Sequence, residues 1–155
     1  MATRAVFFDV DFTLIYPGPT FQGEGYQRFC AKHGMQVDAS AFNRAVAAAS
    51  SLLEDAKDRR YHPQLFIDYT RRIIEGMGGS GPGLDACTRE MYEEWAACQH
   101  FSLYDDVEPV FRELNARGVR IGLISNTHRC LASLQSHFEL NELVSGAISS
   151  SEHGY

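Results

Sequence analysis

Short apolar runs and the helical patterns between them organise the sequence. Residues 4–10 (RAVFFDV) and 119–124 (VRIGLI) have the length and the β-branched or aromatic content of buried strands, and a third apolar run covers 143–148. Amphipathic helical patterns occupy 107–117 and 130–138. The order strand, helix, strand, helix, strand predicts an α/β fold with a parallel sheet and right-handed crossovers.

The region between the first two predicted strands has a different pattern. Apolar residues recur there at helical spacing in four segments, and the glycine-rich stretch 78–83 (GGSGPG) reads as a loop. This pattern indicates a helical module inserted after the first strand. We therefore expect a Rossmann-like core formed by residues 1–16 and 101–155, with a helical insertion over 17–100.

Composition narrows the possible partners of the chain. A net charge of −6 argues against a nucleic-acid surface, because phosphate backbones are bound by excess Lys and Arg. No stretch approaches the roughly 20 apolar residues of a membrane span, and the first residues do not resemble a signal peptide. We expect a cytoplasmic protein whose oligomeric state the sequence leaves open.

The four cysteines show neither a CxxC pair nor the spacing of a zinc finger, which predicts reduced and mostly buried thiols. Because the chain is acidic, an anionic substrate must meet a local cluster of positive groups. Candidates lie in the insertion, but a run of charge is typical of a solvated helix face, and we predict that role for them. They are Lys57, Arg59, Arg60, Arg71 and Arg72.

Two acids follow the first predicted strand. Asp9 and Asp11 are two residues apart, so on a continuing strand their side chains point to the same side. Carboxylates held close repel one another unless a cation or a shared proton is present, and Mg²⁺ is commonly bound by one or two carboxylates plus a substrate phosphate. A carboxylate can also attack phosphorus while a second acid moves protons.

The second predicted strand also ends in polar residues. Ligands of open α/β sheets bind beyond the carboxyl ends of the strands, so Ser125 and Asn126 could hydrogen-bond the oxygens of a phosphoryl group. Asn126 has an alternative role as the N-cap of the following helix, and Thr127 is the better candidate for that cap. For His128 and Arg129 we predict a solvated helix start in preference to phosphate contact.

The segments FFDVDFTL and LISNT together resemble the haloacid dehalogenase superfamily, whose first motif is DxDGT and whose second is a Ser or Thr at a strand end. The resemblance implies that Asp9 is the nucleophile and a Mg²⁺ ligand. It implies that Asp11 is the general acid/base and binds the metal through its backbone carbonyl. Thr13 would orient the acid, Ser125 would bind phosphate, and the helical insertion would be a cap that closes over the substrate.

The sequence also departs from the family pattern. Phe12 stands where the family usually has Gly. The family's third motif, a Lys usually just after a sequence like SSEHGY, and its later pair of acids do not occur before Tyr155. We expect from this a truncated or proteolysed form of a longer protein, with an incomplete parallel sheet and an incomplete catalytic site.

These observations predict a Mg²⁺-dependent phosphohydrolase that acts on a small phosphorylated metabolite through an aspartyl-phosphate. Dehalogenases of the superfamily lack an acid at the position of Asp11, so that residue favours phosphate chemistry. A phosphomutase of the same family is the enzymatic alternative. A non-catalytic binding or scaffold protein is the alternative from another class, because the later motifs do not appear.

Overall fold

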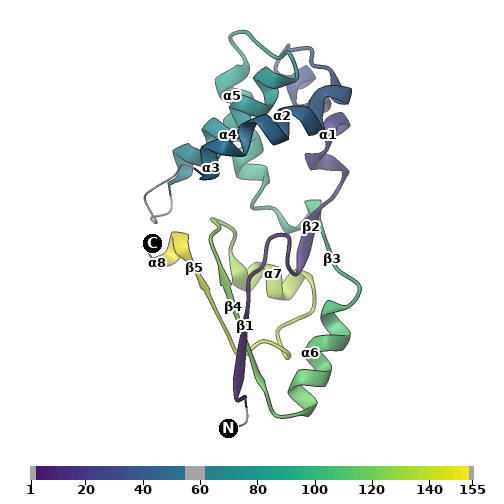
Figure 1. Cartoon of the computed structure of the whole chain (residues 1–155), viewed down its shortest axis with the longest axis vertical. Coiled ribbons are helices and arrows are strands. Elements are labelled where there is room, and N and C mark those ends of the chain that lie inside the picture. The colour runs from purple at the N-terminus through teal and green to yellow at the C-terminus, as the bar shows by residue number, and fades with distance from the viewer. Residues whose placement is uncertain (1–2, 55–61, 154–155) are drawn as a thin grey trace. The chain divides into compact units, whose positions relative to one another are not determined.

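The computed structural model describes residues 3–54 and 62–153 and confirms the mixed α/β class (Figure 1). The chain divides into two compact units. One comprises Met1–Pro17 with Ala96–Tyr155, and the other comprises Gly18–Trp95. The first unit contains the predicted sheet, and the second is helical.

The sheet of the first unit has the strand order β1-β4-β5, and both strand pairs are parallel. Its strands are β1 (Ala5–Phe8), β4 (Arg120–Ser125) and β5 (Gly146–Ser149). In register, Phe8 lies opposite Leu123 and Ser125 lies opposite Ser149. The carboxyl ends of all three strands therefore meet at one edge of the sheet.

Helices of the first unit complete its core. Helix α6 (Val107–Ala116) packs against β4, and α7 (Leu131–His137) packs against β5. The buried ring of Phe111 on α6 lies 5.0 Å from the ring of Phe8. Gly118 has a φ of 74°, a conformation that favours glycine, and it turns the chain from α6 into β4.

A second, antiparallel pair of strands lies beside this core. It joins β2 (Ile15–Pro17) to β3 (Phe101–Leu103), a short strand that follows the 3-10 helix η3 (Cys98–His100). The hydrophobic pattern does not predict this pair, because three-residue strands are too short to show an alternation. The unit also includes α8 (Ser150–His153), which follows β5 directly.

The second unit is a set of short helices packed on one another. Helix α4 contacts both α2 and α5, and α1 packs on η1 and α5. Ile73 and Ile74 of α4 are buried in its core, as are Cys30 of α1 and Cys87 of α5, whose thiols hydrogen-bond each other. Its elements are η1 (Pro19–Phe21), α1 (Gly23–Lys32), η2 (Ala39–Ala41), α2 (Phe42–Ala49), α3 (Ser51–Glu54), α4 (Pro63–Gly76) and α5 (Leu84–Glu94).

The cysteines among the described residues are free thiols. Two are buried as predicted, whereas Cys98 is partly exposed and Cys130 is exposed. Within residues 3–54 and 62–153, no helix has the length and apolarity that crossing a membrane requires.

Candidate active site

The two acids of the first motif lie on a tight loop. Strand β1 ends at Phe8, and the chain then folds back so that the Phe12 amide donates to the carbonyl of Ile15 and the Leu14 amide donates to the carbonyl of Val10, both at 2.8 Å. The side chains of Val10 and Leu14 are buried and anchor the loop. The expectation that a continuing strand carries both acids is therefore wrong, because the backbone hydrogen bonds of residues 10–15 close a turn instead.

Asp9 is the exposed member of the acid pair. Its Oδ2 accepts a hydrogen bond from the hydroxyl of Thr13 at 3.3 Å. Thr13 was predicted to orient Asp11, and the contact that the structure places there is with Asp9. This hydrogen bond holds one carboxylate oxygen of Asp9, while the carboxylate remains accessible to solvent.

Asp11 has a different environment, since only 18% of its side chain is exposed. Burial raises its pKa, the guanidinium of Arg129 opposes this rise, the negative charge of Asp9 adds to it, and a hydrogen bond with the Thr127 side chain lowers it. The net effect is a raised pKa. The pair thus consists of an accessible carboxylate and a largely buried acid.

Arg129 is fully buried, so the prediction that it belongs to a solvated helix start is wrong. Its Nη2 lies 3.2 Å from Oδ1 of Asp11, and its guanidinium carbon lies 3.9 Å from the centroid of the Phe101 ring. A buried charge requires a partner of opposite sign, and Asp11 is one. Its contacts with Asp11 and Phe101 place Arg129 in the interior of the first unit and not at an exposed helix start.

The residues after β4 have other roles than helix capping. Cys130, and neither Asn126 nor Thr127, is the N-cap residue of α7. Thr127 is buried, and its hydroxyl oxygen accepts a hydrogen bond from the Arg129 amide at 3.2 Å. Asn126 is exposed, and its Oδ1 accepts a hydrogen bond from the Ser150 hydroxyl at 2.6 Å. Helix α7 begins at Leu131, close to the predicted span 130–138, so the loop of Asn126 and Thr127 precedes the helix and Thr127 contacts Asp11 instead.

Two buried serines end the neighbouring strands. Ser125 is the last residue of β4 and Ser149 is the last residue of β5, and they are register partners. Asp9 follows Phe8, the partner of Leu123, so it lies at the same edge as Ser125. The structure therefore brings Asp9, Asp11, Thr13 and Ser125 to one end of the parallel sheet.

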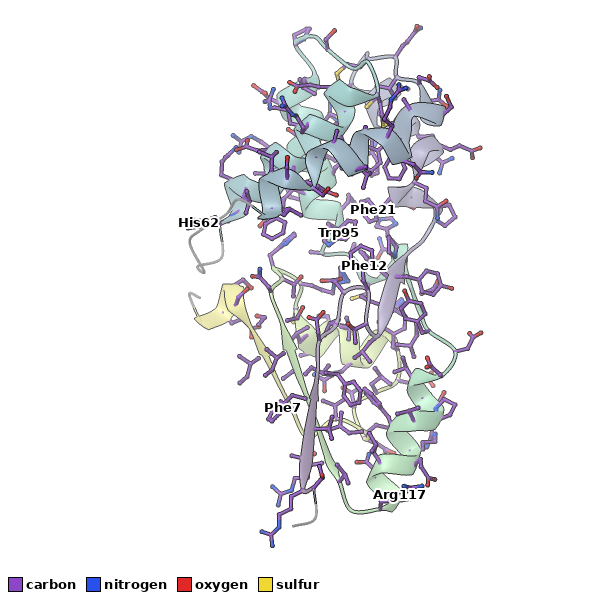
Figure 2. All side chains as sticks on the ribbon, in the orientation of Figure 1. Phe7, Phe12, Phe21, His62, Trp95 and Arg117 are labelled. Carbon is purple, nitrogen blue, oxygen red and sulfur yellow. The ribbon has the colours of Figure 1, made fainter. Side chains whose placement is uncertain are left out.

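Phe12, labelled in Figure 2, directly follows Asp11 on the loop after β1. Its backbone φ is 62°, in the left-handed region, and 65% of its surface is exposed. The loop thus keeps a conformation suited to glycine although a phenylalanine occupies the position.

A divalent metal would find oxygen ligands at this edge. The carboxylate of Asp9 is accessible, and Asp11 would supply its backbone carbonyl, because its carboxylate is paired with Arg129. Hard cations such as Mg²⁺ use one or two carboxylates, with water and substrate phosphate completing the shell. No group of three or more His, Cys, Asp or Glu side chains with metal-binding geometry occurs among the described residues. The acid pair fits Mg²⁺ as a partial shell.

The positive groups of the insertion do not form a cluster within the described residues. Lys57, Arg59 and Arg60 lie outside those residues. Arg71 forms an ion pair with Asp85, and Arg72 is exposed.

Sequence reasoning missed two contributors to this end of the sheet, Phe101 and Ser149, and it predicted a solvated position for a third, Arg129. Phe101 and Arg129 meet only because β3 returns to the first unit after the whole helical segment. A buried serine at the end of a strand has no pattern of its own, although Ser149 shares its position in the strand with Ser125.

Fold and site together define an α/β protein with an acid pair at the carboxyl ends of parallel strands. The sequence model of the haloacid dehalogenase-like hydrolase family matches residues 3–155. The chain therefore belongs to the haloacid dehalogenase-like hydrolases. No protein with a curated description matches it.

Solved structures of low sequence identity share the fold. A candidate beta-phosphoglucomutase from Thermotoga maritima aligns over 97% of this chain and 62% of its own, with 12% identity and a TM-score of 0.63. A magnesium-bound candidate HAD-hydrolase, YfnB from Bacillus subtilis, aligns over 98% and 67%, with 12% identity and a TM-score of 0.63. A 2-haloacid dehalogenase from Pseudomonas syringae aligns over 99% and 66%, with 18% identity and a TM-score of 0.52. The chain spans about two thirds of the length of these three proteins.

Proposed function

We propose that this chain carries the nucleophile and the acid/base of a Mg²⁺-dependent phosphohydrolase that acts on a small phosphate ester. The different environments of Asp9 and Asp11 carry this proposal. Two neighbouring carboxyl groups, one exposed to solvent and one largely buried, are suited to opposite roles, the first as a nucleophile and the second as an acid. Asp9 is exposed, while burial raises the pKa of Asp11.

The proposed reaction has two steps. Asp9 Oδ attacks phosphorus, the bond to the ester oxygen breaks, and Asp11 gives that oxygen its proton. Asp11 then takes a proton from a water molecule, which attacks the aspartyl-phosphate and releases inorganic phosphate. Ser125 and Asn126 would hydrogen-bond the phosphoryl oxygens, where charge accumulates.

Mg²⁺, when bound by Asp9 and by the backbone carbonyl of Asp11, would neutralise charge on the phosphoryl oxygens. The oxygen ligands described above and the magnesium-bound relative support this part of the proposal. The helical unit Gly18–Trp95 would act as the cap, a role supported by its compactness and by the way it interrupts the sheet-containing unit in the sequence.

Asp11 also favours a phosphatase over a dehalogenase. A departing halide needs no proton, whereas an alkoxide leaving group does. A largely buried carboxyl group with a raised pKa can supply that proton. The likeness to a dehalogenase structure concerns the fold, at 18% identity.

The test is hydrolysis of p-nitrophenyl phosphate and of a panel of sugar phosphates, with and without Mg²⁺. Asp9→Asn removes the nucleophile, so we expect the rate to fall to the uncatalysed background. Asp11→Asn keeps the nucleophile and removes the proton donor, so we expect a loss of about 10²–10⁴-fold. The loss should be smaller with p-nitrophenyl phosphate, whose leaving group needs little protonation.

The matched control is Glu142→Gln, which removes an exposed acid from the loop between α7 and β5. It should retain the wild-type rate. Undiminished hydrolysis by Asp9→Asn would rule out the covalent mechanism, and equal losses for all leaving groups in Asp11→Asn would rule out its role as the acid.

A further inference from the structure

The buried cation beside the acid pair is the feature from which this inference starts. The Arg129 side chain has 0% exposure, and it lies 3.2 Å from Oδ1 of Asp11. Burying a guanidinium is costly unless nearby groups compensate for the lost hydration. The position of this charge next to the proposed acid therefore suggests a role in the function of that acid.

Two contacts fix the guanidinium in space. Its carbon lies 3.9 Å from the centroid of the Phe101 ring, so the aromatic face and the cation attract one another. The ion pair with Asp11 then sets the direction in which Nη2 points. The ring holds the guanidinium carbon against its face and the ion pair orients Nη2 toward Asp11, and together these contacts restrict the movement of the guanidinium.

The backbone that carries Arg129 is tied to the same acid. The Arg129 amide donates to the hydroxyl oxygen of Thr127, and the Thr127 side chain hydrogen-bonds Asp11. The segment after β4 therefore holds the Asp11 carboxylate through two side chains. Two anchors restrict rotation of a carboxylate about its Cβ–Cγ bond, which a single anchor does not.

We propose that Arg129, stacked on Phe101, is a positioning residue that fixes the plane of the Asp11 carboxylate toward the leaving group of the substrate. This inference rests on the proposed function, since it assigns Asp11 the role of acid. Arg129 touches the acid and acts through it. The family's second motif region would thus contribute an orienting cation as well as the phosphate-binding Ser125.

The chemistry of the contact favours arginine specifically. A planar guanidinium can stack on an aromatic ring while one of its nitrogens contacts a carboxylate, whereas an ammonium group is a point charge on a flexible stem. Arg129→Lys therefore retains the charge and loses the fixed plane. Phe101→Leu retains the arginine and removes the surface on which it stacks.

The test compares steady-state kinetics of Arg129→Lys, Arg129→Gln and Phe101→Leu with wild-type protein. Misplacement of a reacting group by about 1 Å can cost about 10²-fold, so we expect kcat to fall about 10- to 100-fold in both Arg129 variants and less in Phe101→Leu. KM should stay within about 3-fold, because the interaction serves the transition state. Arg112→Lys, in an exposed ion pair with Glu108 on α6, is the matched control and should keep the wild-type kcat.

A purely structural role predicts another result. If Arg129 only stabilises the loop, Arg129→Lys should lower the urea midpoint of unfolding while the folded enzyme keeps its kcat, and that outcome overturns the proposal. A rise in KM with kcat unchanged would also overturn it, because Arg129 would then bind substrate directly.

A second measurement does not depend on activity. In a double-mutant cycle of Arg129→Gln and Asp11→Asn, followed by urea unfolding, the shifts in midpoint should be clearly non-additive if the two side chains form a pair. Additive shifts would overturn the inference. If wild type and Asp9→Asn hydrolyse phosphate esters equally slowly, the proposed function fails and the positioning role fails with it, while the cycle still decides whether the ion pair exists.

Discussion

Phe12 holds a backbone conformation that residues with a Cβ rarely adopt, with a φ of 62°. The left-handed region costs roughly 1–2 kcal/mol for such residues. The cost is tolerated because the hydrogen bond from the Phe12 amide to Ile15 and the buried neighbours Val10 and Leu14 determine the path of the loop. Strain of this kind beside a pair of acids is typical of positions kept for function.

A comparison of Phe12→Gly with Phe12→Ala isolates the strain. Both variants lose the aromatic ring, but only glycine accepts the left-handed conformation without steric cost, at the expense of greater freedom in the unfolded chain. We expect Phe12→Gly to unfold with a free energy about 1 kcal/mol higher than that of Phe12→Ala. Urea titration followed by circular dichroism measures the difference. Equal stabilities would show that the loop relaxes away from the left-handed conformation.

The local sequence pattern was sufficient to predict some residues of the candidate site and insufficient to predict others. Asp9, Asp11 and Ser125 could be found because they end apolar runs, and the runs are visible in the sequence. Arg129 could not, since its neighbours are polar and its partners Phe101 and Asp11 are distant in sequence. Burial of a charged residue is decided by tertiary contacts that no local window contains.

Among the elements, β1 and β4 were predictable from their apolar runs and α6 from its amphipathic period. The β2–β3 pair was not predictable. Helix α7 was predicted over 130–138 and lies there, but its cap was assigned to the wrong residues because Asn126 and Thr127 have the composition of helix caps. In the second unit, a contact between helices depends on charge. Glu90 of α5 contacts Nζ of Lys32 at 2.5 Å and Nε2 of His33 at 2.6 Å, at the end of α1.

This contact makes the stability of the helical unit depend on pH. The hydrogen bond from Lys32, followed by that from His33, lowers the pKa of Glu90 below 4.5. A lowered pKa in the folded state stabilises the protein above the unfolded value, and this contribution disappears as the pH falls through the folded value. Glu90→Gln should therefore lower the urea midpoint at pH 7. It should have little effect at a pH below the folded-state pKa of Glu90, where this carboxyl group is protonated in the wild type.

Glu93→Gln, one turn along the exposed side of α5, is the control for loss of a charge alone. Its urea midpoint should follow that of wild type at every pH. A Glu90→Gln deficit that persists unchanged from pH 7 to the lowest accessible pH would mean that packing, and not charge, accounts for the effect.

At the scale of the whole molecule, the class of fold was predictable because the order of strands and helices restricts the topology to a few solutions. The exposed apolar surface of the described sheet was not predictable from the sequence. Phe7, Ile124 and Ile148 on β1, β4 and β5 are 62%, 49% and 47% exposed, and Figure 2 shows Phe7 on the side of the sheet away from α6. Apolar side chains on three adjacent strands form a surface that water solvates poorly.

This face should bind a hydrophobic dye in the native state. We expect Ile124→Thr and Ile148→Thr to lower the fluorescence of bound anilinonaphthalene sulfonate, because threonine keeps the branched shape that suits a strand and reduces the apolar area. Val110→Thr removes an exposed apolar residue on α6 and should leave the fluorescence unchanged. Equal dye binding by all variants, with unchanged circular dichroism, would place the binding elsewhere.

The ring of Phe7 lies across Gly122 on the neighbouring strand, where a Cβ would come within 2.5 Å of two ring carbons. Because Gly122 has no side chain, the Phe7 ring can occupy the space above it. Over evolutionary time the two positions are therefore not free to drift separately: a methyl group at 122 has to follow, or be followed by, a smaller or reoriented side chain at 7. Homologues should show this exchange as correlated substitution.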